Sequence, residues 1–272
     1  MRTAEARPEV KSAARILDLL ELLGAAAGPL RHSEIARHME MPKSSASALL
    51  DTLEGRGYVT SGADGYVIAE HYREGGWALG EYGVVLRVAR GAMQRVAQET
   101  GESAFLAVPA HDWQVRYVEK VVSENPLRYD IPLGTQRPAH STSVGRVLLA
   151  EMPDEMLQRY LSSDRVAKVT PKTVTDPRKI MAAIERVRRD GRALISDSSV
   201  VGASGVAAPI RDSSGAVLAS LCVIAPSARF NAAADHITRI VCDAAARIGA
   251  ALPPVAASPD GARQRRRSVW KA

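Results

Sequence analysis

A helix-turn-helix pattern in residues 34–59, EIARHMEMPKSSASALLDTLEGRGYV, constrains the fold of this chain more than any other segment. Ile35, Ala36 and Met39 have the spacing of one apolar helical face. Pro42 suits the first position of a new helix, because its missing N–H would be unpaired there in any case. The segment therefore predicts a short helix, a tight turn and a second helix.

The second helix is predicted to have an apolar inner face and an outer face of small side chains near its start. The apolar positions recur at helical spacing, at Ala46, Leu49, Leu50 and Leu53. Small hydroxyl groups and a lysine on the outer face would let the backbone approach DNA closely and bond phosphates or base edges. The candidate DNA contacts, including nearby basic residues, are Lys43, Ser44, Ser45, Ser47, Ala48, Arg31, His32 and Arg56.

A hairpin is predicted directly after the second helix. Residues 58–60 and 66–68 are β-prone runs, and the sequence SGADG between them is a turn signal. Two helices and a hairpin in this order are typical of a winged helix-turn-helix, whose second helix enters the DNA major groove. The alternative interpretation is a packed subdomain that does not bind DNA.

The charge of the chain is unevenly distributed. The whole sequence has 36 basic and 30 acidic residues, for a formal charge of +6. Residues 1–72 have eight basic and ten acidic residues, a net charge of −2, whereas residues 253–272 have a net charge of +4. DNA phosphates would therefore be bound by a few well-placed groups and by amides at helix starts, because the predicted DNA-binding segment is not basic as a whole.

Length and composition predict a two-domain protein of the cytoplasm. A chain of 272 residues is long enough for two domains with separate cores. No apolar run approaches the ~20 residues of a membrane span, and the first residues lack the apolar core of a signal peptide. The two cysteines lack metal-ligand spacing, so we expect reduced core residues, no metal and no cofactor.

The second half of the chain alternates predicted strands and helices. The strands are predicted at 103–108, 114–122, 205–210 and 217–225, and the helices at about 142–151, 154–161, 176–190 and 232–251. Strand pairs mixed with helices indicate an α+β sensor-like domain. The predicted organisation is a flexible N-terminus (1–9), a winged helix-turn-helix domain (10–72), a linker helix region (73–100), an effector-binding and oligomerisation domain (101–252) and a disordered basic tail (253–272).

The chain resembles the IclR family of transcriptional regulators. The resemblance rests on the collinear order of VKSAARILDLLELL, MPKSSASALLDTLEGRGYV, YVEKV, GTQRPAHSTSVGRVLLA, VTDPRKIMAAIERVRRDGRAL, GVAAPIRD and SLCVIAP. It implies a winged helix-turn-helix domain, a linker helix and a C-terminal GAF-like effector-binding domain. It also implies a homodimer or dimer of dimers (a homotetramer) that binds palindromic double-stranded DNA operators. The expected function is repression of catabolic genes in response to a small molecule.

The predicted recognition helix departs from the family pattern at one pair of residues. Family members often have a large polar or basic pair where this chain has Ser47 and Ala48. A basic side chain there can reach a guanine, whereas alanine offers only a methyl contact to thymine. Sequence readout is therefore expected to depend more on the hydroxyl groups, the lysine, the wing and the shape of the DNA.

The resemblance also implies an effector site. In members that bind small carboxylates, helix-start amides hold the anion, and these map to Ser143 and Val144 beside His140. The sequence STSVG agrees, since a hydroxyl-rich helix start has free N–H groups, although Ser141 or Thr142 could merely cap the helix. The other positions at which such pockets have polar side chains are occupied in this chain by Ile195, Gly205, Cys222 and Ile224. This loss of polar groups predicts an acid with an aromatic or apolar body.

The sequence leaves two other classes of function to consider, an enzyme and a simple binding module. Ser143, His140 and Asp197 could be imagined as a hydrolytic set, but the sequence has no G-x-S-x-G, H-E-x-x-H, Walker or G-x-G-x-x-G segment. An enzyme is therefore not expected. A ligand-binding or non-specific DNA-binding module is the other alternative.

Overall fold

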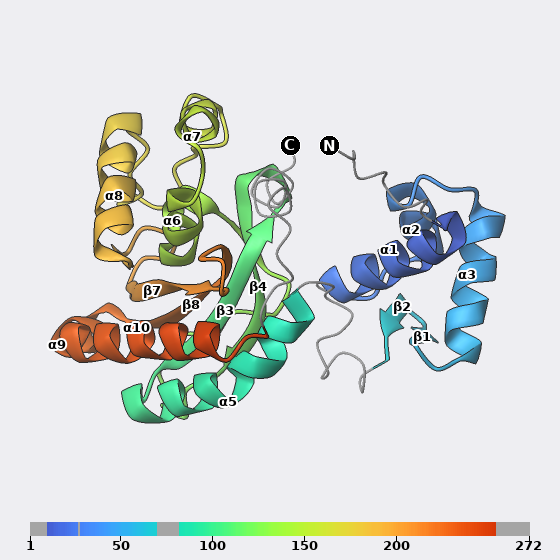
Figure 1. Ribbon diagram of the computed structural model, residues 1–272, viewed down its shortest axis with the longest axis horizontal. Coiled ribbons are helices and arrows are strands. Elements are labelled where there is room, and N and C mark those ends of the chain that lie inside the picture. The colour runs from blue at the N-terminus through green and yellow to red at the C-terminus, as the bar shows by residue number, and fades with distance from the viewer. Residues whose placement is uncertain (1–9, 27, 70–81, 254–272) are drawn as a thin grey trace, which may run out of the picture. The chain divides into compact units, whose positions relative to one another are not determined.

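The computed structural model describes residues 10–26, 28–69 and 82–253, and Figure 1 shows their helices and strands. The chain divides into two compact units, one up to Gly83 and the other from Val84. No helix of the described chain is both long and apolar enough to cross a membrane.

Several predictions lie outside the described residues. These are the flexible N-terminus (1–9), the part of the linker region within 70–81, and the basic tail from residue 254 onward.

The first unit is a small helical domain with a hairpin. Its elements are α1 (Lys11–Ala25), α2 (His32–His38), α3 (Lys43–Gly55), β1 (Val59–Gly62) and β2 (Gly65–Ile68). One apolar face of α1 is buried, and it packs with residues of the other elements in one core. The core residues are Leu19, Leu20, Leu23, Ile35, Leu50, Leu53, Val59 and Ile68.

The turn between α2 and α3 differs in one detail from the prediction. Glu40 has a positive φ of 47°, which reverses the chain after α2. Pro42 was expected as the first residue of α3, but it is the N-cap, with an extended ψ of 143°. Its carbonyl oxygen accepts hydrogen bonds from the amides of Ser45 and Ala46 at 3.0 and 3.1 Å. The helix therefore begins one residue later, at Lys43, because Pro42 contributes its acceptor from outside the helix.

β1 and β2 form the predicted antiparallel hairpin, with Val59 opposite Ile68. Leu30 pairs with Tyr66 on the other side of β2. Gly65 has a φ of +134°, and a Cβ atom there would lie 2.4 Å from the carbonyl oxygen of Leu30. The close approach of the α1–α2 connection to the hairpin therefore requires glycine at this position.

The second unit is built on one six-stranded antiparallel sheet. The strand order is β5-β4-β3-β8-β7-β6. The strands are β3 (Ser103–Ala110), β4 (Gln114–Val121), β5 (Gln136–Pro138), β6 (Ala193–Ser196), β7 (Ala203–Arg211) and β8 (Val217–Pro226). The pairs β3–β4 and β7–β8 are the predicted hairpins. The two edge strands, β5 and β6, are too short to produce a recognisable pattern of their own.

Helices cover both faces of this sheet. Figure 1 shows α5 (Tyr82–Thr100) and α10 (Ala234–Ala250) on one face. On the other face lie α6 (Ser143–Ala150), α7 (Asp154–Leu161) and α8 (Pro177–Asp190). The helix predicted over 232–251 is α10. A short helix that was not predicted, α9 (Ser227–Ala232), precedes it, and Ala233, with a non-helical φ of −129°, separates the two.

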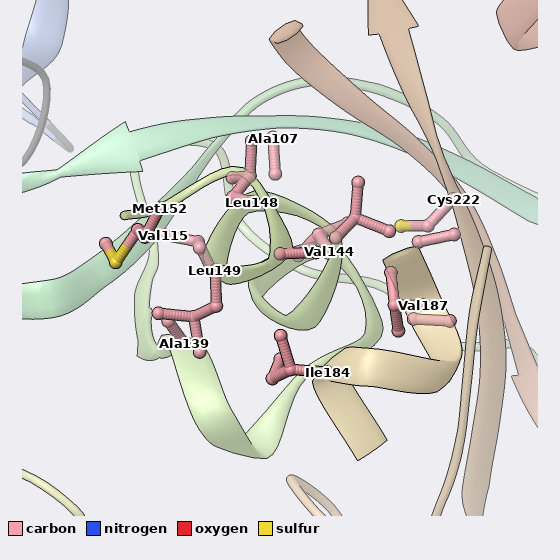
Figure 2. Packing of buried hydrophobic residues seen from close by; sticks show 14 of the residues in the cluster. Ala107, Val115, Ala139, Val144, Leu148, Leu149, Met152, Ile184, Val187 and Cys222 are labelled. Atoms are coloured by element: carbon pink, nitrogen blue, oxygen red, sulfur yellow. The ribbon is translucent and has the colours of Figure 1, made fainter. Parts of the chain in front are cut away.

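The main core of the second unit lies between the sheet and the helices α6, α7 and α8. Figure 2 shows α6 at its centre, with Val144, Leu148 and Leu149 surrounded by residues of β3, β4, β8 and α8. This packing buries the first turn of α6.

Candidate functional site

The outer face of α3 is accessible at its start. Lys43, Ser44 and Ala48 are exposed, whereas Ser45 is half-buried. Ala46, Leu50 and Leu53 face the core as predicted. The structure therefore presents small side chains and one lysine on the surface expected to contact DNA.

Ser47 differs from its neighbours because its hydroxyl group is bound within the domain. Its Oγ atom lies 2.9 Å from Nε2 of His32, and the same nitrogen lies 3.1 Å from the carbonyl oxygen of Lys43. These contacts join the start of α2 to the first turns of α3. Two of the predicted DNA contacts, Ser47 and His32, thus bind each other, a pairing that fifteen residues of separation hid from the sequence pattern.

The remaining predicted DNA contacts are basic residues at the edges of the motif. The side chains of Arg31 and Arg56 are exposed. The Arg31 amide donates a hydrogen bond of 2.8 Å to the Glu34 carboxylate, which caps α2. Glu54 accepts hydrogen bonds from the amide and hydroxyl of Ser61 at 3.0 and 2.5 Å, so the wing is bonded to α3.

In the second unit, strand pairing brings the four predicted pocket residues of the sheet together. Ile195 is opposite Gly205, and Gly205 is opposite Ile224. Cys222 precedes Ile224 by two residues, so it lies on the same face of the sheet. Phe105 is opposite Cys222 on the other neighbouring strand. Residues from β3, β6, β7 and β8 therefore form one surface.

This surface is apolar and partly accessible. Ile195 and Ile224 are half-buried, whereas Cys222 has no exposed surface and packs in the same cluster as Val144 (Figure 2). Burial raises the pKa of the Cys222 thiol, which stays neutral. A Cβ atom at Gly205 would lie 3.1 Å from Cγ1 of Ile224, so the isoleucine side chain covers the glycine.

The first turn of α6 lies against this surface with two amides unused. Thr142 caps the helix, and its hydroxyl accepts a 3.0 Å hydrogen bond from the Gly145 amide. Ser143 is 5% exposed and Val144 is fully buried. Within the described residues, neither amide has a hydrogen-bond acceptor. Two N–H groups in a buried first turn form a site where an anion can bind.

Close packing holds this helix start in place. A Cβ atom at Gly145 would lie 2.1 Å from the carbonyl oxygen of Ala139, in the 3₁₀ turn η3 (Ala139–Ser141). Ser141 donates a hydrogen bond of 2.9 Å to the Pro138 carbonyl, so its hydroxyl belongs to this turn rather than to the cap.

His140 has a structural role that the sequence did not predict. Its Nδ1 atom lies 2.7 Å from the hydroxyl of Tyr160, and its Nε2 atom lies 2.9 Å from the carbonyl oxygen of Ala167. Both ring nitrogens are thus bound within the domain, and a ligand could use one only by breaking such a bond. Burial lowers the pKa of His140, which favours the neutral ring.

Three aromatic residues were not predicted as site residues: Phe105, which is part of this surface, and Tyr117 and Tyr129, which contact Phe105. Phe105 makes edge-to-face contacts with Tyr117 and Tyr129, with ring centroids 5.9 and 6.2 Å apart. Burial raises the pKa of both phenols, while the nearby charge of Arg137 acts in the opposite direction. The phenols are neutral at physiological pH and can donate hydrogen bonds. The alternation of Val115 and Tyr117 in β4 was the one available sequence signal.

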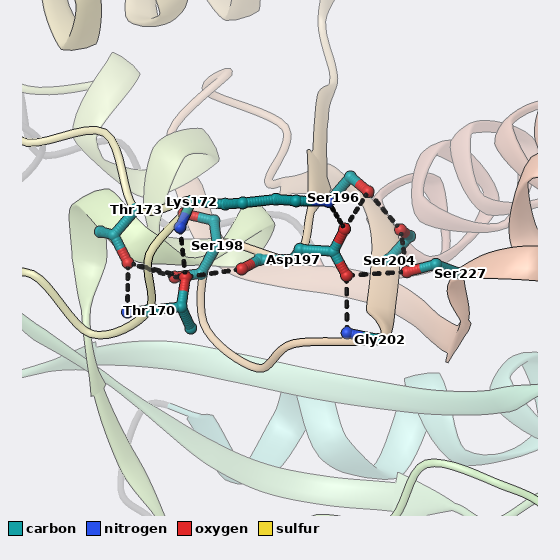
Figure 3. A network of polar contacts seen from close by, with 9 residues as sticks. All are labelled: Thr170, Lys172, Thr173, Ser196, Asp197, Ser198, Gly202, Ser204 and Ser227. Carbon is teal, nitrogen blue, oxygen red and sulfur yellow. Dashed lines mark hydrogen bonds and ion pairs between the residues drawn. The ribbon is translucent and has the colours of Figure 1, made fainter.

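A polar network around Asp197 lies at the connection between β6 and β7 (Figure 3). The Asp197 carboxylate accepts hydrogen bonds of 2.6 Å from Lys172 and from the Gly202 amide, and one of 3.2 Å from Ser227. Its pKa is lowered, chiefly by the bond from Lys172. Because Asp197 is bound to these groups and His140 to others, Ser143, His140 and Asp197 are not assembled as a hydrolytic set.

Comparisons with known proteins agree with this architecture. Residues 12–62 match the IclR helix-turn-helix domain, and residues 81–250 match the bacterial transcriptional regulator IclR C-terminal domain. The chain belongs to the IclR family. It is a transcriptional regulator with a helix-turn-helix DNA-binding domain, and not an enzyme. In the described residues, no cluster of three histidine, cysteine or acidic side chains could hold a metal ion.

Relatives with known names include regulators of several kinds. The chain is 30% identical to the HTH-type transcriptional regulator BhcR of Paracoccus denitrificans, over 92% of this chain and 90% of that protein. It is 29% identical to the Pca regulon regulatory protein of Pseudomonas putida, over 77% and 72%. An IclR homolog from Microbacterium hydrocarbonoxydans, solved in complex with 4-hydroxybenzoate, has 26% identity and a TM-score of 0.68, over 88% and 98%.

Proposed function

We propose that this IclR-family regulator represses catabolic genes and that a small organic acid with an aromatic or apolar body controls its binding to DNA. The observation that carries the proposal is the pair of buried amides at Ser143 and Val144, which have no acceptor among the described residues. A buried amide without a partner costs free energy comparable to a lost hydrogen bond. A carboxylate or phenolate oxygen at this helix start would supply the missing acceptor.

The surroundings of the amides favour an apolar ligand body. Phe105, Cys222 and Ile224 present carbon and a neutral thiol, and apolar burial contributes about 25 cal/mol per Å². A small dicarboxylate would leave its second charge without a partner in this environment, which is costly. A homolog solved with 4-hydroxybenzoate supports the same class of ligand for this chain.

The DNA-binding part of the proposal places α3 in the major groove of a palindromic operator bound by a dimer or a dimer of dimers. The contacts proposed at its start are the exposed Lys43, Ser44 and Ala48 and the half-buried Ser45. The substitution Lys43→Ala should weaken binding to all DNA sequences alike. It should also reduce the slope of the logarithm of the binding constant against the logarithm of salt concentration by about one unit, as expected for one lost phosphate contact. Unchanged salt dependence in gel shifts would contradict the placement of Lys43 at a phosphate.

Calorimetric titration with benzoate, phenylacetate and pyruvate tests the proposed effector class. We expect the two aromatic acids to bind and to change operator affinity in gel shifts, with pyruvate binding more weakly. Tight binding of pyruvate without a response to the aromatic acids would show that the pocket is polar. No binding of any acid to a protein that still oligomerises would favour a domain that serves only in assembly.

A substitution at Ile224 locates the ligand body. Ile224→Ser removes apolar surface from a half-buried position, and we expect it to weaken benzoate binding. Val201→Ser is the matched control, because Val201 is 65% exposed. Gly205→Phe is unsuitable as a test, since even a Cβ atom there would lie 2.8 Å from the carbonyl oxygen of Val223. Equal effects of the two serine variants would mean that the ligand does not contact Ile224.

A further inference from the structure

A basic groove lies between α6 and α8, and the proposed function does not use it. Figure 1 shows these two helices side by side, and they pack against each other. The groove consists of two adjoining hollows, of about 560 and 250 Å³, that share Arg146, Ala183 and Arg186. The larger volume is within the range of small-molecule sites.

The larger hollow has a cationic rim and an apolar floor. Its basic residues are Arg146, Lys179, Arg186 and Arg189, and the other lining residues are Val174, Ala182 and Ala183. None of the lining residues is acidic. The smaller hollow adds Arg192 and one acid, Asp190.

Most of these cations lack a carboxylate partner. Arg189 pairs with Asp190, with 3.1 Å between Nε and Oδ1. In the part of the chain that the structure describes, no carboxylate lies within 4.0 Å of the charged groups of Arg146, Lys179 or Arg186. The nearby Glu185 is engaged by Arg188 on the same helix.

The side chain of Arg146 is held in this groove by a hydrogen bond to a backbone carbonyl group. Its Nε atom donates a 3.1 Å hydrogen bond to the carbonyl oxygen of His140, which fixes the half-buried guanidinium beside α8. Burial lowers the pKa of Arg146, and the charge of Arg186 lowers it further. Two guanidinium groups that repel each other without a counter-charge would be stabilised by a bound anion.

We propose that the groove binds a small phosphate-bearing molecule with a compact apolar body, at a site separate from the proposed effector pocket. A phosphate monoester has a charge of about −1.5 to −2 near neutral pH, which suits at least two unpaired cations. Guanidinium groups match phosphate oxygens in bidentate geometry. The alanine and valine floor would receive the apolar body. The ligand would then bridge α6, whose first turn holds the effector amides, to α8.

Calorimetric titration of the full chain with phenyl phosphate, inorganic phosphate and benzoate tests this site at low ionic strength. We expect phenyl phosphate to bind more tightly than inorganic phosphate, because only the ester fills the apolar floor. Arg186→Gln should weaken phenyl phosphate binding about tenfold, the loss expected for one charged hydrogen bond. Arg186 is exposed and has no ion pair among the described residues, so this variant should fold normally.

The matched control is Arg178→Gln, an equal charge change at an exposed position of the same helix that lines neither hollow. We expect it to alter phenyl phosphate binding less than about twofold. Equal losses in both variants would show general charge attraction and overturn the site, as would absence of phenyl phosphate binding. A tenfold loss of benzoate affinity in Arg186→Gln would mean that the groove belongs to the effector pocket. Inorganic phosphate binding as tightly as the ester would overturn the apolar part of the proposal.

Discussion

The starts of α3 and α6 use similar residues for different surroundings. Both have small hydroxyl side chains within a short stretch, KSSAS in the first turns of α3 and STSVG around the N-cap of α6. Lys43 and Ser44 are exposed, whereas Ser143 and Val144 are buried. An exposed helix start suits a large, solvated polyanion such as DNA, and a buried one suits a single desolvated anion. The chemistry of a helix start is therefore decided by what packs around it as well as by its own residues.

The two helices also differ in how they begin. The N-cap of α3 is Pro42, which has no side-chain acceptor, whereas Thr142 caps α6 with its hydroxyl. The amides of α3 that are not bonded can be hydrated, because that helix start is open to solvent. The start of α6 is buried, and its cap bonds only the Gly145 amide, so the proposed ligand would be the acceptor for the amides of Ser143 and Val144.

The largest expected effect comes from glycine substitutions in the two helices. Gly145→Ala should destabilise the protein by about 3 kcal/mol, because its Cβ atom would overlap the carbonyl oxygen of Ala139. Gly55→Ala in α3 is the control, since nothing lies within 4 Å of a Cβ atom there. Denaturant unfolding of both variants measures the difference. Similar free energies of unfolding would show that η3 does not pack tightly on α6.

Two serine substitutions in α3 separate DNA readout from domain stability. Ser45→Ala should cost about 1–3 kcal/mol of operator affinity if its hydroxyl bonds a base edge, without altering the free energy of unfolding. Ser47→Ala removes a partner of His32 and should lower that free energy by about 1 kcal/mol. Gel shifts and thermal unfolding of both variants distinguish the effects. If Ser47→Ala changes operator preference but leaves the free energy of unfolding unchanged, the contact of Ser47 with His32 is not important for stability.

Removing the cap of α6 should have a smaller effect. Thr142→Ala deletes the acceptor of the Gly145 amide and should destabilise the second unit by about 1 kcal/mol. Thr142→Ser keeps the hydroxyl and should restore most of that stability. The control is Pro42→Ala at the start of α3, which removes no side-chain cap and should change the free energy of unfolding less than Thr142→Ala does. A larger effect of Pro42→Ala would contradict the comparison of the two helix starts.

The smallest expected effect is a pH dependence caused by His140. The folded state lowers the pKa of this ring below its ordinary value of 6.5, chiefly through burial. The folded state then binds fewer protons than the unfolded state, so this contribution is complete above pH 6.5 and is lost as the pH falls toward the folded-state pKa. Thermal unfolding between pH 7 and pH 5 should show a decline that is reduced in His140→Gln. Parallel declines in both proteins would assign the effect to other groups.

The fold was largely predictable because its longer elements have local signals. The apolar face of α1, the hairpin turns and the Asp176 cap of α8 each depend on residues close in sequence. The short strands β5 and β6 were not predictable, since they exist only through pairing with β4 and β7. The break at Ala233 also lacked a proline or glycine to mark it.

The candidate site was less predictable because its parts come from distant segments. The positions of Ile195, Gly205 and Ile224 came from family resemblance, and only the strand register shows that they are neighbours. The cluster of Phe105, Tyr117 and Tyr129 joins three segments and has no shared pattern. Contacts of this kind depend on tertiary packing, which a single sequence does not display.

The packing of Gly145 on Ala139 has a consequence for the genetics of this regulator. Every amino acid that a single-base change can substitute for glycine has a Cβ atom, so no such missense mutation at this codon avoids the overlap. For a transcriptional regulator, loss of its C-terminal domain would appear as altered expression of its target genes. A screen for regulatory mutants should therefore recover several different substitutions at residue 145, whereas the codon of Gly55 should tolerate the change to alanine without a phenotype.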